Sequence, residues 1–383
     1  MATRMLGRAV FGAFSRSVTP AGARSCCNAS RVTQNSSRIH WIAAGIGFAG
    51  SAYVFGVSNT NNAASSFDDL RRITVKGTEY LIEDEQWANI VPPQFTVSRK
   101  VDGPTDLPGV RLTLFQYQTC PFCCKVRAFL DFVGVPYDVV EVDPVLRQQI
   151  KFSTYRKVPI LLLQEGDNCW QLNDSTVIIS ILQSYLLNKN DGIRKYLGLY
   201  RPVKTKDDSG KQVTEVYNKY NIMFGVSQPD MKAIQEEIRW RKWADEVLVH
   251  VLSPNVYRTR EEALQAFNYF SEAGDWERLF PAWERYMVIY VGATAMYFVG
   301  KRLKRKYNLK DDVRLSFYDE CTKWVRNLKG KTFAGGEEPN LADLAVFGVL
   351  NSVEGCSAFQ DVLQHTKIQR WYDDMKKVTR RSE

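Results

Sequence analysis

The chain has 383 residues, of which 45% are hydrophobic and 24% are charged, a balance typical of globular proteins and not of disordered or fibrous ones. This length accommodates two domains of about 100–200 residues each, with additional segments. The formal net charge is +9, but residues 1–67 contribute six arginines and no lysine, aspartate or glutamate, so +3 (9 − 6) remains for the rest. We therefore exclude nucleic-acid binding, because the remaining charge is close to neutral.

The N-terminal segment has the composition of a targeting sequence. Residues 1–40 contain arginine and serine but no acidic residue, as in a mitochondrial transit peptide, although a disordered basic tail has the same composition. Residues 41–57 follow as a run of seventeen uncharged, mainly apolar residues. This is the short end of the roughly 17–25 residues that span a bilayer, so we predict a membrane anchor, with a buried helix as the alternative.

Residues 58–99 are expected to form a polar tether and an N-terminal extension, and residues 100–190 carry the clearest pattern of secondary structure. Apolar periodicity predicts strand, helix, strand, short helix, two strands and helix in that order. A parallel opening followed by an antiparallel pair of strands predicts an α/β thioredoxin-like domain. The expected strands are 110–117, 137–142, 158–163 and 169–172, and the expected helices are 123–134, 145–152 and 174–187.

The remainder of the chain is predicted to be helical after a break. Residues 191–235 are polar and rich in turn formers, and we expect a linker or insertion there. Residues 236–383 form the predicted all-α domain. Its expected features are a long amphipathic helix at 231–252, a buried helix at the apolar run 286–300, which is short for a membrane span, and a capping box at Asn340 and Asp343.

A cysteine motif follows the first predicted strand, in the stretch Tyr-Gln-Thr-Cys-Pro-Phe-Cys-Cys at 117–124. Cys120 precedes a helix N-terminus, where unpaired amides and the helix dipole stabilise a thiolate, so it is the candidate nucleophile. Cys123 lies one turn further on, close enough to resolve a disulfide on Cys120, and Cys124 is expected to be a packed thiol. A zinc site would need about two more ligands, and the chain has only three histidines. Eight scattered cysteines form no disulfide framework, which favours a reducing compartment.

Two downstream motifs predict that an extended thiol peptide binds beside Cys120. Val158-Pro159 precedes a strand, where thioredoxin-like folds keep a cis-proline and leave the valine backbone free to pair with a peptide such as glutathione. Asp174 and Ser175 lie at a helix N-terminus, which suits a bound carboxylate, although simple helix capping explains them as well.

Several stretches carry a resemblance to known proteins. Cys-Pro-Phe-Cys resembles the glutaredoxin motif, and a thioredoxin-like unit followed by an all-α domain resembles the glutathione transferase superfamily. Within it, residues of about 70–383 resemble the family of type 2 membrane-associated prostaglandin E synthases. The stretches that carry this resemblance are LTLFQYQTCPFCCKVRAFLDF, YRKVPILL, QLNDSTVIIS, SPNVYRT and PNLADLAVFGVL.

The resemblance implies an isomerase that converts the prostaglandin H endoperoxide into prostaglandin E. It assigns the essential thiol to Cys120 and the pocket lining to Tyr117 and Phe122, which are otherwise an ordinary strand aromatic and a packing residue; the part played by Cys123 stays open. The implied glutathione-binding positions are Val158, Pro159, Asp174 and Ser175.

The resemblance also implies a haem-bound form that degrades the endoperoxide. The implied haem contacts are His250, Ser253 and Arg302, although the sequence alone favours a core histidine and a solvated basic face. It further implies a homodimer, and a single-pass protein of the Golgi or microsomal membrane with a cytoplasmic truncated form, whereas the leader composition indicates mitochondria.

Two other functions are compatible with the same residues. A glutaredoxin-like thiol-disulfide oxidoreductase uses the same fold and the same Cys120, and its dithiol route needs Cys123. A non-catalytic module, tethered to the membrane through residues 41–57, binds haem or a protein partner.

Overall fold

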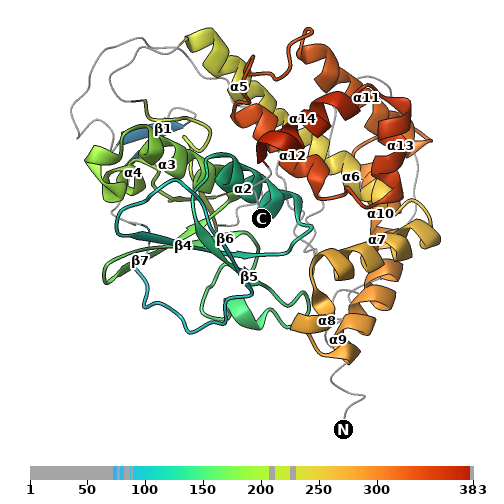
Figure 1. Ribbon diagram of the computed structural model, residues 1–383, viewed down its shortest axis with the longest axis horizontal. Coiled ribbons are helices and arrows are strands. Elements are labelled where there is room, and N and C mark those ends of the chain that lie inside the picture. Colours follow the sequence, from blue (N-terminus) through green and yellow to red (C-terminus); the bar gives the residue numbers. More distant parts are fainter. Residues whose placement is uncertain are drawn as a thin grey trace, which may run out of the picture. The chain divides into compact units, whose positions relative to one another are not determined.

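The computed structural model describes residues 89–206, 212–224 and 230–379, together with 72–75, 78–81 and Trp87. All of them belong to one compact unit of the chain. Its sheet has five strands in the order β3-β5-β4-β6-β7, with helices α2 and α3 on one face (Figure 1). The strands are β3 (Arg99–Val101), β4 (Val110–Gln116), β5 (Tyr137–Glu141), β6 (Ile160–Glu165) and β7 (Asn168–Asn173).

The strand directions confirm the predicted thioredoxin-like topology. β4 and β5 are parallel, β6 is antiparallel to β4, and β7 is antiparallel to β6. The central strands are apolar on both faces because both faces are covered, which is why they read as continuous hydrophobic runs. The edge strand β3 was not predicted, since three residues are too few to establish a periodicity.

Helices account for most of the remaining described residues. The two small hairpins outside the main sheet are β1 (Arg72–Val75) with β2 (Thr78–Leu81), and β8 (Val203–Lys206) with β9 (Gln212–Glu215). The helices are α2 (Pro121–Phe132), α3 (Ser175–Leu187), α4 (Ile193–Leu199), α5 (Met231–Trp243), α6 (Val249–Val256), α7 (Arg260–Ala273), α8 (Trp276–Leu279), α9 (Ala282–Met287), α10 (Ala293–Lys306), α11 (Val313–Asn327), α12 (Leu341–Asn351), α13 (Ser357–His365) and α14 (Gln369–Thr379), with short 3-10 turns at Gln148–Ile150 and Lys189–Asp191 and π-helical turns at Ala244–Leu248 and Val288–Gly292.

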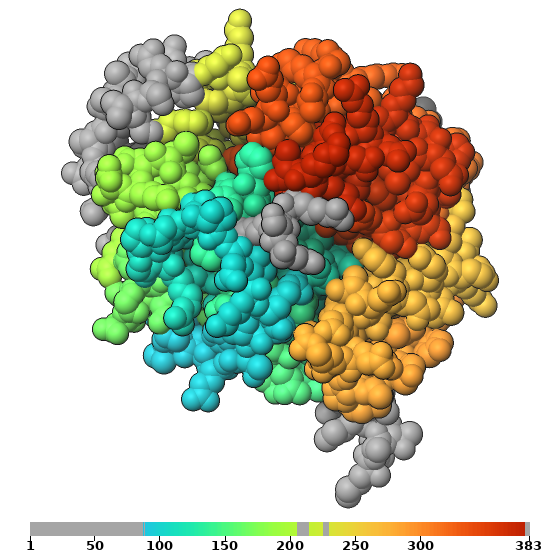
Figure 2. All heavy atoms as spheres, in the orientation of Figure 1, coloured from blue at the N-terminus to red at the C-terminus, as the bar shows by residue number. Residues whose placement is uncertain are grey.

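Helix α12 packs closely on α2, the helix that follows the cysteine motif. Figure 2 shows the red C-terminal residues directly against the cyan and teal residues of the thioredoxin-like part. The contact depends on Gly348, because a Cβ atom there would lie 2.5 Å from Lys125 Cα, closer than real Cβ atoms approach a backbone atom. The predicted capping box of α12 is confirmed, with Asn340 and Asp343 exchanging side-chain to backbone hydrogen bonds.

The predicted long amphipathic helix is present as α5 and α6, joined by the π-turn Ala244–Leu248. The wider turn points Asp245 at the thioredoxin-like part, where it forms an ion pair with Lys125 and accepts a hydrogen bond from Thr176 Oγ1 at 2.9 Å. The charge of Lys125 and these hydrogen bonds lower the pKa of Asp245 against the effect of burial. This contact ties the cysteine-bearing helix to the helical half.

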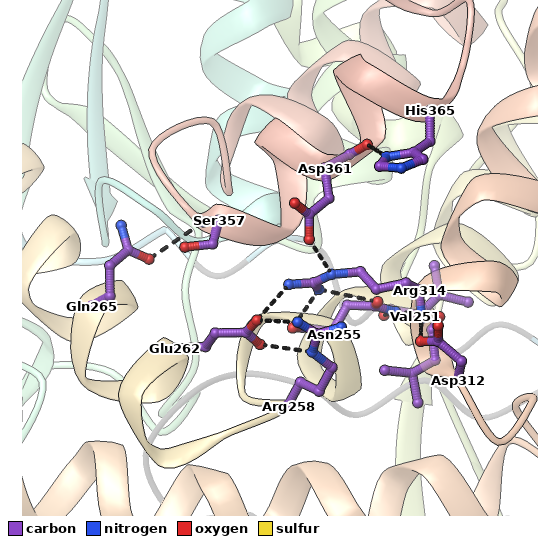
Figure 3. Close-up of polar contacts among 11 residues, drawn as sticks. Val251, Asn255, Arg258, Glu262, Gln265, Asp312, Arg314, Ser357, Asp361 and His365 are labelled. Carbon is purple, nitrogen blue, oxygen red and sulfur yellow. Dashed lines mark hydrogen bonds and ion pairs between the residues drawn. The ribbon is translucent and has the colours of Figure 1, made fainter.

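A buried arginine joins four helices of the helical half (Figure 3). The Arg314 side chain is 2% exposed and its Nε donates to Asp361 Oδ2 at 2.8 Å. Its Nη2 donates to Glu262 Oε1 at 3.0 Å, and its Nη1 donates to the Asn255 carbonyl at 2.7 Å. These contacts connect α6, α7, α11 and α13 through one cation.

Two predicted helices differ from the structure. The short helix expected at 145–152 is only a 3-10 turn, because Asp143 Oδ1 accepts from the amides of Val145 and Leu146 and Arg147 adopts a positive φ of 51°. The helix expected to be buried at 286–300 exists as α9 and α10, but it is not buried as a whole. Its most exposed large side chains, together with Trp283 just before it, are Tyr286, Tyr290, Val291 and Phe298.

The segment 191–235, expected to be a linker or insertion, contains α4 and the β8–β9 hairpin. After the hairpin, the chain packs back on α3, where Ser180 Oγ donates to the Lys219 carbonyl at 2.6 Å. The polar composition of this segment does not predict the packing, because the contacts are made largely by backbone atoms.

The localisation to a membrane through a single span is corrected by the structure. No helix in the described part of the chain has the length and apolar character needed to cross a bilayer. The leader at 1–40 and the expected anchor at 41–57 lie outside the described residues.

Candidate active site

Cys120 lies at the junction of strand and helix predicted for it. It is the N-cap of α2, with Pro121 at the first helical position, where a missing N–H leaves no hydrogen bond unmade. Its amide donates to the Tyr117 carbonyl at 3.1 Å, and its own carbonyl accepts from the Cys124 amide at 2.8 Å. The side chain is 3% exposed, so the sulfur lies at the base of the site and not on the open surface.

The two cysteines of the motif have opposite acidities. The Cys123 thiol donates a hydrogen bond to the Cys120 sulfur, which lowers the pKa of Cys120, and the amides of Cys123 and Phe122 and the charge of Arg127 act in the same direction against burial. Burial and the same hydrogen bond raise the pKa of Cys123. Cys120 is therefore the more acidic thiol of the pair, with Cys123 as its hydrogen-bond donor.

Cys124 lies on another side of α2, as the helical period requires. Its sulfur accepts from Arg127 Nη2 at 3.1 Å, and burial raises the pKa of Cys124 to about 11. Arg127 is fixed by Gln116 Oε1 at 2.6 Å and by the Gln118 carbonyl at 2.7 Å. Arg127 was missed from the sequence. The available signal was a charged residue on a helix face that is otherwise apolar, since such a residue requires buried partners.

Aromatic side chains surround the thiol pair. Tyr117 and Phe122 are partly buried against the cluster that contains Cys120 and Cys123. Burial raises the pKa of Tyr117, so its hydroxyl remains protonated and is available as a donor. Tyr155 belongs to the same cluster and was not predicted. Its hydroxyl interacts electrostatically with both the thiols and Asp174, and burial raises the pKa of Tyr155.

The two predicted glutathione motifs lie around the same cluster. The Val158-Pro159 peptide bond is cis, as predicted, and Val158 is 4% exposed beside the cysteines. Asp174 is the N-cap of α3, and its Oδ1 accepts from the Thr176 amide at 2.8 Å. Ser175 begins the helix and is buried. Tyr155 lies within electrostatic range of both Asp174 and the Cys120–Cys123 pair.

The residues implied as haem contacts lie on α6 and α10. The ring of His250 stacks on Tyr307 with 4.2 Å between centroids and is 8% exposed, and burial lowers the pKa of His250 to about 4, so it carries no charge near neutral pH. The buried Ser253 hydroxyl has no partner, and α10 passes close to this residue at Gly300. Arg302 is exposed further along α10.

Among residues 89–206, 212–224 and 230–379, no group of three or more His, Cys, Asp or Glu side chains is placed to hold a metal ion. Cys120 and Cys123 therefore gain no further ligands from this part of the chain.

Known proteins match this arrangement at the level of sequence. The domain family described as "Glutathione S-transferase, N-terminal domain" matches residues 114–185. Prostaglandin E synthase 2 of Mus musculus is 52% identical over 276 residues, covering 70% of this chain and 71% of that protein. Prostaglandin E synthase 2 of Danio rerio is 48% identical over 293 residues, covering 75% of this chain and 76% of that protein.

Among solved structures, glutaredoxin 2 from Salmonella typhimurium in complex with glutathione is 17% identical, with a TM-score of 0.35 over 70% of this chain and 94% of that chain. The fold class, a thioredoxin-like domain followed by an all-α glutathione-transferase-type domain, rests on the sheet topology, the succession of helices and the domain-family match.

Proposed function

Because this chain belongs to the prostaglandin E synthase 2 family, and is therefore an enzyme, we propose that it converts the prostaglandin H endoperoxide into prostaglandin E with the Cys120 thiolate as nucleophile. In this proposal glutathione binds beside Cys120 and Val158, with one end toward Asp174. The reaction is an isomerisation, because one carbon of the endoperoxide is oxidised to a ketone while the oxygen on the other is reduced to a hydroxyl.

The chemistry balances with one thiol. The Cys120 thiolate attacks one peroxide oxygen, forming an S–O bond and breaking the O–O bond, and the second oxygen leaves as an alkoxide. Tyr117 donates a proton to this alkoxide, which becomes the product hydroxyl. Loss of the hydrogen on the carbon that bears the S–O oxygen, as a proton, then forms the ketone and expels the thiolate. The electrons taken from sulfur return to it, so no external oxidant or reductant is needed.

The observation that carries this proposal is the position of Cys120 as the N-cap of α2, directly before Pro121 and packed in one cluster with Cys123. The Cys123 thiol and the amides of Cys123 and Phe122 lower the pKa of Cys120 against burial, which favours a thiolate at the helix N-terminus. The sequence alone left the part of Cys123 open, and the geometry supports assigning it as a donor.

The test is product analysis with the full chain and prostaglandin H endoperoxide, with and without glutathione. We expect prostaglandin E from the wild type and from Cys123→Ser, which keeps a hydroxyl donor, and none above the spontaneous background from Cys120→Ser. Tyr117→Phe is expected to be slower by roughly 10²-fold or more if Tyr117 transfers the proton. Equal product from all variants and from buffer would show that the endoperoxide decays without the protein, and would overturn the proposal.

Thiol-disulfide oxidoreduction is the second candidate, favoured by one observation: Cys120 and Cys123 are both free thiols and lie within hydrogen-bond contact. Reduction of a protein disulfide by two thiols requires Cys123 to form the second sulfur bond, so Cys123→Ser should abolish it. Isomerisation should survive the same change. The two activities are thus separated by one variant.

The haem contacts implied at His250, Ser253 and Arg302 stay a prediction and form no part of this proposal. The homodimer implied by the superfamily resemblance stays a prediction, and sedimentation equilibrium of the full chain tests it.

A further inference from the structure

We propose that the cavity between α2, α12 and α14 binds a small organic carboxylate, with Arg127 as its principal contact. The cavity lies where α12 and α14 pack on α2 (Figure 1). It is separate from the thiol pair, because neither Cys120 nor Cys123 lines it. The inference therefore goes beyond the proposed function and does not depend on it.

The buried lysine and arginine side chains of the described part of the chain have a carboxylate partner, with one exception. They are Lys125, Arg127, Arg241 and Arg314. Ion pairs of 4.0 Å or less join Lys125 to Asp245, Arg241 to Glu237, and Arg314 to Glu262 and Asp361. Arg127 is 9% exposed and forms no ion pair with any described residue. Because buried charges are rarely left without a counter-charge, Arg127 is the buried cation best suited to bind an anion from solution.

The groups that do contact Arg127 carry no charge. Its Nη1 donates to Gln116 Oε1 at 2.6 Å, and its Nη2 donates to the Gln118 carbonyl at 2.7 Å and to Cys124 Sγ at 3.1 Å. Burial raises the pKa of Cys124 to about 11, so this thiol is neutral near pH 7. These bonds use three of the five N–H groups of the guanidinium and leave two for a ligand.

Two carboxylates lie near Arg127 without forming an ion pair with it. Gln116 separates Glu141 from Arg127, because its Nε2 donates to Glu141 Oε1 at 2.6 Å. Glu141 is also paired with Arg99 at 3.4 Å. Asp131 lies one helical turn beyond Arg127 and lines the same cavity. Neither carboxylate therefore takes the place of a bound anion.

The charge of the wall favours an anion with a single negative charge. Arg127, Lys376 and Asp131 give the wall a net charge of +1 (2 − 1). Lys376 projects from α14, where its side chain is 34% exposed and pairs with Glu354. An ammonium has three N–H donors, so Lys376 can contact a ligand as well as Glu354. A carboxylate balances this wall, and its two oxygens match the planar donor geometry of a guanidinium.

The size of the cavity limits the body of the ligand. The volume is about 160 Å³, and Ala128 and Phe347 supply apolar surface. A cavity of about 150 Å³ can hold a benzene molecule. Sites for drug-sized ligands have about 300–1,000 Å³, so neither glutathione nor the prostaglandin endoperoxide fits. The cavity therefore matches a carboxylate whose apolar part is no larger than a single ring.

The test is calorimetric titration of the full chain with benzoate, which combines a single ring with a carboxylate. Benzamide has the same shape without the charge, and inorganic phosphate has charge without the ring. The variants are Arg127→Gln and Lys376→Met, the second of which changes a partly exposed side chain. The matched control is Lys377→Met, at the next position of α14, where the lysine is 75% exposed and pairs with Asp374.

We expect the wild type to bind benzoate at least tenfold more tightly than benzamide, as for one hydrogen bond between charged groups. Arg127→Gln should weaken benzoate binding by a similar factor and affect benzamide less. Lys376→Met should weaken benzoate binding by about threefold, because partly exposed charges contribute less. Lys377→Met should match the wild type with every ligand.

Four results would overturn the inference. If glutathione competes with benzoate, the probe binds at the thiol pair and not at Arg127. If benzamide or phosphate binds as tightly as benzoate, the site does not select an organic carboxylate. If the wild type binds no benzoate at millimolar concentration, the cavity is not a carboxylate site. If Arg127→Gln binds benzoate as the wild type does, Arg127 is not the contact; should this variant not unfold cooperatively in urea, an unchanged affinity of Lys376→Met decides against the inference instead.

Discussion

Replacing Arg314 by methionine tests whether the helical half depends on one buried cation. Arg314 is 2% exposed and bonds Asp361 Oδ2 at 2.8 Å, Glu262 Oε1 at 3.0 Å and the Asn255 carbonyl at 2.7 Å (Figure 3). Methionine fills much of the same volume without charge. The change therefore isolates the loss of the cation from the creation of a large cavity.

The expected cost follows from the exposure of the two carboxylates. Removing one partner of a buried ion pair costs about 3–5 kcal/mol, because the remaining charge is left without compensation. The Asp361 side chain is 34% exposed, so water relieves part of its cost, whereas Glu262 is 15% exposed. Glu262 also retains Arg258, whose Nη2 lies 2.6 Å from its Oε1. We therefore expect the lower end of the range, about 3 kcal/mol.

Arg258→Met is the matched control, because it removes the other cation that contacts Glu262. The Arg258 side chain is 38% exposed and lies just before the N-cap of α7, four positions from Glu262. Exposed ion pairs contribute about 0.2–1 kcal/mol. The two variants remove the same type of side chain from the same acceptor, so the difference between their unfolding free energies measures the effect of burial.

The assay is urea unfolding at neutral pH, with the midpoint and slope compared among wild type and both variants. An unchanged slope with a lower midpoint for Arg314→Met is the expected result. The reasoning is refuted if Arg314→Met costs less than about 1 kcal/mol, the value of an exposed pair, or costs no more than Arg258→Met.

Three other changes test the site and its support. Cys123→Ala should slow alkylation of Cys120 by iodoacetamide near neutral pH by roughly tenfold, because a hydrogen bond to a charged acceptor contributes about 1.5–3 kcal/mol. The Cys120 thiolate forms only above the pKa of Cys120, so the profile of alkylation rate against pH should move to higher pH. An unmoved profile would exclude Cys123 as the donor. Gly348→Ala should destabilise the protein by about 1–3 kcal/mol in urea, because its Cβ would collide with the backbone of α2, whereas Gly198→Ala, which meets no atom within 4 Å, should not. Burial and a neighbouring carboxylate raise the pKa of Glu284 from 4.5 to about 8, so the folded state binds the proton more tightly than the unfolded state does. The free energy of unfolding should therefore fall as pH rises from 4.5 to 8. Glu284→Gln should flatten this dependence, and parallel curves of unfolding free energy against pH for the two proteins would contradict the assignment.

Local sequence pattern was sufficient for the thioredoxin-like half and for one end of the site. The position of Cys120 before a helix, the cis bond at Val158-Pro159 and the capping role of Asp174 each depend on a few neighbouring residues, and each was predicted correctly in structure. Patterns failed where local hydrogen bonds compete with helix formation. Asp143 caps the backbone that follows it and reduces the helix expected at 145–152 to a 3-10 turn.

The sequence by itself therefore determined the topology of the sheet and the position of Cys120 at the start of α2, because strand period, helix start and turn chemistry are properties of adjacent residues. Only the tertiary structure decided which groups meet across the chain. Lys219 reaches Asp174 over 45 positions, and Asp245 reaches Lys125 over 120. The same packing covers His250 with Tyr307, 57 positions (307 − 250) away. Such encounters depend on how helices pack, and neither periodicity nor spacing within a segment contains that information.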